Sequence, residues 1–346
     1  MTIILLIFFT YLALTSKIVK NNSEYLSKDY TNIIKGAFLI WVFVSHFRGY
    51  NVALSNQWYD KIGVTLCSKI GQLMVVMFLF YSGYGIMESI KHKGETYVNN
   101  LPKKRILPTW IHFAFAVFVF MIVSQYYVTH EFSLKEMILT YIGWDSYGNS
   151  NWYIFCIIIL YFITYLSAKS FKDNKKILGS MFIGTLLYTT VMSIYKDTYW
   201  YDTAFCFVLG STFSIYRTKI EKWIENRKFI TFIYLIAFFI IAYHFKKYII
   251  FNYIHTILFA MIILIITRKI EIKNTFFKWI GKNLFPMYIF QRLPMMVLNR
   301  NEFMRENPYL FFIIAFIATI GITFIYNFLL KMVNKIKEKN IKCIEK

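Results

Sequence analysis

Charged residues are unusually scarce in this sequence of 346 residues. Asp, Glu, Lys and Arg make up 16% of it, whereas a soluble domain carries roughly 25%. Hydrophobic residues reach 58%, aromatic residues reach 21%, and the mean hydropathy is +0.48. A soluble core of this size does not need so much apolar surface. The composition therefore excludes a soluble globular enzyme and predicts a polytopic membrane protein.

Acidic residues are few as well. Only 18 Asp and Glu stand against 39 Lys and Arg, which gives a net charge of +21. This imbalance does not predict a nucleic-acid partner, because the basic residues form short clusters between apolar runs. Such a distribution is typical of the polar connections of a membrane protein, so we expect membrane lipids as partners and no nucleic acid.

Cysteines and processing signals are also limited. The apolar residues 1–16 lack a basic n-region and a small-residue cleavage site, which predicts a retained span rather than a signal peptide. The cysteines share no metal-ligand spacing, so we expect neither a disulfide framework nor a metal site. There are four of them: Cys67, Cys156, Cys206 and Cys343.

Eleven apolar windows divide the chain, and we interpret each as a transmembrane helix. Several approach the ~17–25 residues that a bilayer requires, and the shorter ones need flanking residues or tilt to cross it. The windows are too long and too little alternating for barrel strands, so they predict an all-α membrane protein. They lie at residues 2–16, 31–47, 64–87, 106–127, 151–168, 177–195, 200–216, 229–245, 248–267, 283–298 and 309–330.

The basic residues predict the orientation of these helices. Most of the 39 lysines and arginines fall in alternate connections, which the positive-inside rule places in the cytoplasm. The prediction is therefore an outer N-terminus and an inner C-terminus. We divide the chain into an extra N-terminal helix with its inner loop (1–30), a membrane domain of about ten helices (31–333) and a basic cytoplasmic tail (334–346).

The second window carries the two residues on which the functional hypothesis depends. In residues 31–50, TNIIKGAFLIWVFVSHFRGY, Lys35 stands at the cytoplasmic entrance and His46 in the outer half. They are eleven positions apart, so both side chains lie on one helix face, about 16 Å apart along the axis. An ionisable residue at that depth is costly to place and predicts a functional site. The alternative, a neutral histidine bonded to a neighbouring helix, stays open.

The third window ends in FLFYSGYGIMES, residues 78–89. Here Ser82, Gly83 and Gly85 predict either a close helix contact or a place where a ligand approaches the backbone, and their spacing favours packing. Glu88, at the end of the span, is expected to be solvated.

The next inner connection carries PKKRILP, residues 102–108. Its cations Lys103, Lys104 and Arg105 can bind phosphate, but they can equally be ordinary positive-inside anchors, which spacing alone favours. On the outer side, Trp152 and Tyr153 open the fifth span, where aromatic residues usually mark the membrane interface.

A late window, WIGKNLFPMYIFQRLPM at residues 279–295, contains Pro286 and Pro294. Two prolines within one apolar segment predict a kinked span. The window also places Gln291 and Arg292 at membrane depth, and we expect Arg292 to face protein or a wet cavity.

Five of these stretches, taken in order, resemble motifs of the integral-membrane acyltransferase-3 family. KGAFLIWVFVSHF is similar to the family's first core helix, in which ten residues separate a basic residue from a histidine. FLFYSGYGI resembles the following helix and KKRILP the basic cytoplasmic motif. NWYIFCIIILY and WIGKNLFPMYIFQ resemble two later helices. The resemblance covers roughly residues 31–295.

The resemblance implies an activity. The family moves acyl groups, commonly acetyl from cytoplasmic acetyl-CoA, onto extracytoplasmic carbohydrate of bacterial envelopes. It implies that His46 is the essential histidine, either as general base for a sugar hydroxyl or as a transient acyl carrier. Lys35 stands where the family usually has arginine, so it keeps the charge but loses the bidentate fork. Position 291 is Gln where many relatives have histidine.

The resemblance also implies where the substrates bind. Arg105 matches the second arginine of an arginine-x-x-arginine motif whose first position is Pro102 here, so Lys103 or Lys104 would substitute for it. Arg105 and Lys104 are then the expected contacts to CoA phosphates. An acceptor hydroxyl would enter from outside, near Trp152 and Tyr153, and Ser82 or Tyr84 are candidates to stabilise an oxyanion.

The sequence thus predicts a membrane O-acyltransferase of the bacterial plasma membrane. It would move acetyl from cytoplasmic acetyl-CoA to a hydroxyl of an extracytoplasmic or lipid-linked glycan. The alternative is a transporter or flippase for an envelope glycan, in which His46 would be a packing or proton-relay residue. No internal repeat supports an inverted-repeat transporter. A glycan polymerase usually has a large outer loop with arginines, and residues 128–150 contain none.

Overall fold

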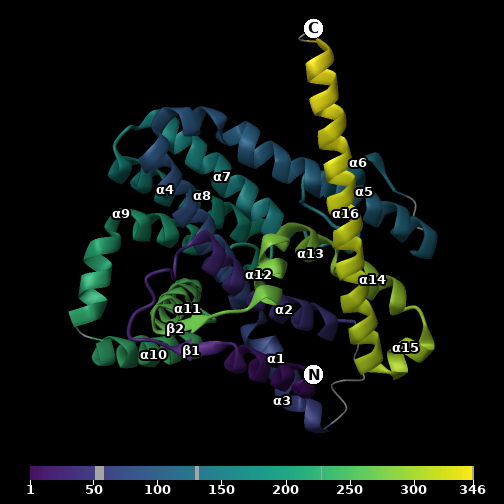
Figure 1. Ribbon diagram of the computed structural model, residues 1–346, viewed down its shortest axis with the longest axis horizontal. Coiled ribbons are helices and arrows are strands. Elements are labelled where there is room, and N and C mark those ends of the chain that lie inside the picture. The colour runs from purple at the N-terminus through teal and green to yellow at the C-terminus, as the bar shows by residue number, and fades with distance from the viewer. Residues whose placement is uncertain (51–57, 129–131, 227, 345–346) are drawn as a thin grey trace.

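The computed structural model describes residues 1–50, 58–128, 132–226 and 228–344, and Figure 1 shows a body made of packed helices. In chain order the helices are α1 (Thr2–Leu14), α2 (Lys28–Arg48), α3 (Lys61–Ile70), α4 (Val76–Leu101), α5 (Leu107–Val128), α6 (Leu134–Tyr141), α7 (Trp152–Ser170), α8 (Asn174–Tyr195), α9 (Phe205–Asn226), α10 (Lys228–His244), α11 (Ile249–Lys269), α12 (Thr275–Lys282), α13 (Leu284–Phe290), α14 (Arg292–Leu298), α15 (Glu302–Glu306) and α16 (Pro308–Ile344).

Strand structure within the described residues is limited to two short segments. β1 (Ser16–Ile18) pairs antiparallel with β2 (Ile270–Ile272), with Lys17 opposite Glu271. This pair fastens the connection after α1 to the connection after α11, two parts of the chain that lie far apart in sequence. The all-α class predicted from the apolar windows is confirmed apart from this two-stranded β pair.

The spans agree with the windows only in part. Every predicted window coincides with helical structure, but in the described residues five helical segments are long and apolar enough to cross a membrane. They are Trp58–Tyr127, Trp152–Ser170, Asn174–Tyr195, Ile249–Lys269 and Pro308–Lys335. Thr2–Leu14, Thr231–His244 and Leu284–Leu298 are apolar but shorter. The count of eleven spans, the orientation and the three-part division of the chain stay predictions.

Helix α2 is absent from those five for a physical reason. It carries Lys28, Asp29, Lys35 and Arg48, but most of its side chains are buried against other helices rather than facing lipid. A helix enclosed by protein does not need a uniformly apolar surface. It begins where the Ser27 hydroxyl accepts the backbone N–H of Tyr30, an N-cap that satisfies one of the free donors of the first turn.

Two pairs of glycines bring helix backbones into contact and fix the centre of the fold. A Cβ on Gly36 of α2 would lie 1.9 Å from the Phe277 carbonyl oxygen, and one on Gly281 of α12 would lie 1.8 Å from that of Asn32. The same reciprocal contact joins α4 and α9, through Gly83 and Gly210. Only glycine permits such an approach. The packing interpretation of Gly83 is therefore correct, whereas a Cβ on Gly85 would meet nothing within 4 Å.

The late window is broken in the predicted way. Helix α13 ends at Phe290 and α14 begins at Arg292 (Figure 1). Pro294 has no N–H to donate to the carbonyl of Phe290, so the helical hydrogen-bond ladder is interrupted there. Arg292 faces protein as expected: its Nε donates to the Tyr50 hydroxyl at 3.2 Å.

Candidate active site

Helix α2 positions Lys35 and His46 on one face of a single continuous helix. Both side chains are half-buried. His46 lies beside Tyr288 of α13, with 6.4 Å between the ring centroids, and Arg292 is the cation whose charge acts on it. Within the described part of the chain the buried His46 Nδ1 has no hydrogen-bond partner. The alternative of a histidine bonded to a neighbouring helix therefore has no support from the geometry at Nδ1.

Buried polar atoms at Tyr288, the neighbour of His46, and at residues that adjoin Tyr288 also lack hydrogen-bond partners among the described residues. They are the Tyr288 hydroxyl, the Gln291 Oε1 and the Ser150 Oγ, and together with His46 we name this group the His46 centre. Tyr288 adjoins Ser150, and the Gln291 amide nitrogen donates to the Tyr288 carbonyl at 2.9 Å. Leaving one such atom unsatisfied costs about 1–3 kcal/mol. The unpartnered His46 Nδ1 and the Tyr288 hydroxyl beside it are therefore candidates for contact with a ligand.

The predicted acceptor residues adjoin the His46 centre. The Tyr153 ring lies 5.3 Å from Tyr288, and the Trp152 ring lies 5.9 Å from Tyr153. Ser82 of α4 lies beside the hydroxyls of Tyr153 and Tyr161. The structure thus brings Ser82, Tyr153 and Trp152 into one group that reaches His46 through Tyr288.

The start of α7 is held in place by the preceding asparagine. Asn151 is buried, and its side-chain amide donates to the carbonyls of Gly143 and Asp145, both at 3.0 Å. These bonds tie the connection between α6 and α7 to the first turn of α7. Because Trp152 and Tyr153 follow directly, the bonds also fix the direction in which both rings enter the bundle.

The basic cluster lies at a separate pocket, which we name the inner pocket because the predicted orientation places it on the cytoplasmic side. Lys103, Lys104 and Arg105 occupy a π-helical turn, η4 (Pro102–Ile106), between α4 and α5, and all three are exposed. Lys104 and Arg105 line a cavity of about 440 Å³, whereas Lys103 is absent from its described lining. The other residues around it are Ser89, Lys93, Thr96, Tyr97 and Asn100.

A glycine shapes this inner pocket. Gly94, inside α4, has φ 53° and ψ −139°, a conformation that is essentially restricted to glycine. The break bends the last turns of α4, which carry Thr96, Tyr97 and Asn100, relative to the part that carries Ser89. The inner pocket therefore lies at a bend rather than along a straight helix.

Electrostatic contacts connect the inner pocket to the His46 centre. The charge of Arg105 acts on Lys35 and on the Tyr161 hydroxyl. Tyr161 adjoins Ser82, and Ser82 adjoins Tyr153. A line of polar side chains therefore runs from Arg105 through the interior to Tyr288 and His46.

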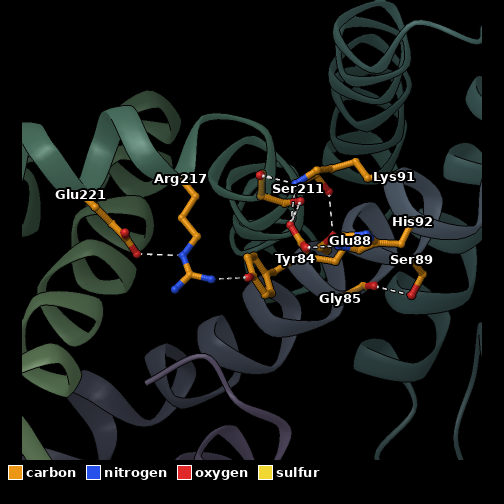
Figure 2. A network of polar contacts seen from close by, with 11 residues as sticks. Tyr84, Gly85, Glu88, Ser89, Lys91, His92, Ser211, Arg217 and Glu221 are labelled. Atoms are coloured by element: carbon orange, nitrogen blue, oxygen red, sulfur yellow. Dashed lines mark hydrogen bonds and ion pairs between the residues drawn. The ribbon is translucent and has the colours of Figure 1, made fainter. Parts of the chain in front are cut away.

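A second polar group at the inner end of α4 differs in that its members bond to one another (Figure 2). We name it the inner network: Tyr84, Glu88, Lys91, Ser214, Arg217 and Glu221. Glu88 Oε1 accepts from Lys91 Nζ and from the Ser214 hydroxyl, both at 2.7 Å. The expectation that Glu88 is solvated is met only in part, because its side chain is 26% exposed and also bonds to residues of α4 and α9.

Arg217 extends the inner network. It donates to Glu221 at 2.8 Å and to the Tyr84 hydroxyl at 3.3 Å (Figure 2). Tyr84 is thus held by α9 at the inner end, away from the residues that surround His46. Of the two residues considered for the oxyanion role, only Ser82 adjoins the line from Arg105 to His46.

Sequence reasoning did not assign a role to Tyr288 or Tyr161. Both stand in stretches that resemble family motifs, as the tyrosine of FPMYIFQ and the last residue of NWYIFCIIILY. Tyrosine at 27 positions in the chain gives no local signal, so only the packing of α7 against α4 and α13 singles these two out. In the described ranges, no three metal-ligating side chains gather at one place.

Comparison with known proteins gives one match. A family model described as an acyltransferase domain, that of the acyltransferase-3 family, matches residues 28–328. No curated protein and no solved structure matches the chain. The matched region includes the His46 centre, the inner pocket and all of the predicted site residues.

Proposed function

We propose that this chain, which belongs to the acyltransferase-3 family and is a membrane acyltransferase, moves acetyl from acetyl-CoA to a hydroxyl of a glycan. The donor would bind at the cytoplasmic side and the acceptor on the other side of the bacterial plasma membrane. The family match carries the acyltransferase activity. The group of unpartnered polar atoms around His46 is the observation that carries the proposed location of the chemistry.

The inner pocket suits the charged end of the donor. Lys93, Lys104 and Arg105 offer positive charge to phosphates, and arginine adds a planar fork for two phosphate oxygens. Tyr97 offers a ring against which a base can stack. The charge of Arg105 also acts on Lys35 and Tyr161. The acetyl-bearing arm of the donor, on leaving this pocket, would therefore pass along the residues that connect Arg105 to His46.

At the His46 centre, the proposed role of His46 is proton transfer. A ring nitrogen of His46 takes the proton of the acceptor hydroxyl while the oxygen of that hydroxyl attacks the carbonyl carbon of the acetyl thioester. The C–S bond then breaks, and the thiolate leaving group receives the proton. The Tyr288 hydroxyl makes no hydrogen bond within 3.5 Å in the described residues, although Ser150 adjoins it, and it would donate to the carbonyl oxygen as negative charge develops. Tyr153 and Trp152 would border the path of the acceptor.

Acetyl-CoA binding and turnover by detergent-purified protein test this proposal. We expect His46→Ala to abolish thioester turnover without loss of acetyl-CoA binding, and Arg105→Ala to weaken binding. His244→Ala is the matched control, because His244 is exposed at the end of α10. An enzyme that does not bind acetyl-CoA, or a His46→Ala variant with normal turnover, would overturn the proposed donor or the proposed site. Glycan movement without acyl transfer would instead favour the transporter.

A further inference from the structure

A second large pocket lies far from the inner pocket. It has a volume of about 720 Å³ and is bordered by Gln72 and Leu73, just before α4 begins, whereas the inner pocket lies at the end of α4. Its remaining lining comes from the end of α3, the connection after α8, the connection between α10 and α11, and the first turns of α11. The predicted topology places all of these on the outer side. We name it the outer pocket.

Lysines dominate the charge of the outer pocket. Lys69, Lys196, Lys246 and Lys247 line it, against Asp197 and Asp202. Lys196 is already engaged, because its Nζ lies 3.6 Å from Asp145.

The other three lysines are less compensated. No carboxylate oxygen in the described residues lies within 4.0 Å of Lys69, Lys246 or Lys247. Lys69 and Lys246 both contact the Tyr243 ring, at 5.7 and 4.5 Å from its centroid. The pocket therefore presents cations that lack a close protein counterion.

Asp202, the buried one of the two acids, does not pair with these lysines. It lies in the turn before α9 and is bonded by the side-chain amides of Gln72, at 3.1 Å, and Asn252, at 3.4 Å. Each of its two carboxylate oxygens is therefore engaged by an amide rather than by a lysine.

An unpartnered ring nitrogen points independently to a ligand. His255, on α11, lines the outer pocket and is 3% exposed. Its ring stacks on Phe239 at 4.3 Å, yet its buried Nε2 has no hydrogen-bond partner in the described part of the chain. As at the His46 centre, a ligand that supplies the missing bond would remove the cost of burying this atom.

Aromatic rings connect the outer pocket to the His46 centre. Tyr199 lines the pocket, and its ring lies 6.1 Å from Trp152. From Trp152 the contacts continue through Tyr153 and Tyr288 to His46, with centroid distances of 5.9, 5.3 and 6.4 Å. His46 is not part of the pocket's described lining. A molecule that fills the pocket and also reaches His46 must therefore be longer than one sugar.

We propose that the outer pocket binds an anionic segment of the acceptor glycan, one that carries carboxylate or phosphate groups, and so selects polyanionic glycans as substrates. The inference rests on the proposed function, because it names the class of acceptor used by that site. Lys69, Lys246 and Lys247 would pair with the anionic groups, the amides and aromatic rings would contact sugar, and a neighbouring residue of the same chain would present its hydroxyl at His46.

Binding of a matched pair of oligosaccharides tests the proposal. The probes are an oligogalacturonide and its carboxyl-reduced, neutral form, offered to purified protein in nanodiscs of neutral lipid. We expect the anionic probe to bind more tightly than the neutral one, by about tenfold, and to weaken as salt rises. Lys69→Gln and Lys246→Gln should each lower affinity for the anionic probe by about threefold to tenfold and leave the neutral probe unaffected. Lys61→Gln, an exposed lysine of the same helix α3, is the control.

The outcomes separate this inference from the proposed function. Equal binding of both probes, or an anionic preference that survives both lysine changes, would overturn the anionic-acceptor assignment even if acyl transfer is intact. Competition by nanodiscs containing phosphatidylglycerol that depends on Lys69 would assign the pocket to a lipid headgroup and overturn it too. Lysine-dependent binding of the anionic probe without any turnover of acetyl-CoA would support the pocket while the proposed function fails.

Discussion

The His46 centre is buried and the inner network is partly exposed, and the two polar groups also differ in how their polar atoms are satisfied. In the inner network Glu88, Lys91 and Arg217 bond to partners on α4 and α9 (Figure 2). In the His46 centre four buried polar atoms have no partner among the described residues. A satisfied network holds helices together, whereas an unsatisfied one is stabilised only when a ligand completes it. We therefore expect the inner network to contribute to stability and the His46 centre to contribute to catalysis.

Removal of His46 has the largest expected effect. His46→Ala should lower the rate of acyl transfer by about 10³-fold, because general base catalysis typically contributes 10² to 10⁴. It should leave the apparent melting temperature of the purified protein nearly unchanged, since no hydrogen bond to Nδ1 is lost. Transfer assays beside thermal unfolding monitored by tryptophan fluorescence measure both. A variant that unfolds early would make His46 a structural residue instead.

The Tyr288 hydroxyl gives a sharper version of the same contrast. Tyr288→Phe removes an unpartnered buried hydroxyl, so stability should stay equal or rise. If that hydroxyl donates to the developing oxyanion, kcat should fall by about 10²-fold with little change in KM. Tyr326→Phe is the control, because Tyr326 also has an unpartnered hydroxyl in the described residues but contacts His112 and Phe290 instead. Normal kcat in Tyr288→Phe would remove Tyr288 from the mechanism.

The contact that supports the inner network should respond in the opposite way. Gly83→Ala places a Cβ 1.9 Å from the Phe207 carbonyl oxygen, so α4 and α9 must separate and the yield of folded protein should drop sharply. Gly85→Ala, two residues away, has open space and should be tolerated. Detergent-solubilised yield and melting temperature distinguish the two. Equal behaviour of both variants would contradict the close α4–α9 contact.

Glu88 tests the inner network itself. Glu88→Ala should cost about 1 kcal/mol, because the Ser214 hydroxyl loses a half-buried partner and Lys91 an exposed one, and should lower the melting temperature by a few degrees. Activity per folded molecule should be retained. Glu95→Ala, an exposed acid on the same helix, should change neither quantity. Loss of activity at full stability in Glu88→Ala would mean that the network takes part in catalysis.

Lys35→Arg, which conserves the charge, should change activity less than the substitutions of His46 and Tyr288 above. Lys35→Arg keeps the charge near Arg105 and restores the fork that the family usually has at this position, so activity should stay within about twofold. Lys35→Ala should lose most activity while the protein still folds. The rate of acyl transfer, measured for both variants and for wild type, tests this role. A fully active Lys35→Ala variant would exclude Lys35 from the site.

Much of the fold and part of the site were accessible from the sequence. Apolar length predicted the helices, and Pro294 predicted the break between α13 and α14. The order of motifs predicted His46, Arg105 and the aromatic pair at the start of α7. Local sequence patterns could not show which motifs contact one another in the fold. Such contacts depend on how pairs of helices pack, as in the contact of Gly36 with Phe277. For the same reason the partners of Glu88 on α9 and the position of Tyr288 beside His46 required the structure.

The central claim is that donor and acceptor reach His46 from opposite sides of the membrane. The most direct measurement uses oriented proteoliposomes, with labelled acetyl-CoA supplied only at the face that carries Arg105 and an acceptor glycan only at the other face. We expect label on the glycan with wild-type protein and none with His46→Ala. Label that appears only when both substrates share one face would contradict transfer across the membrane through this site.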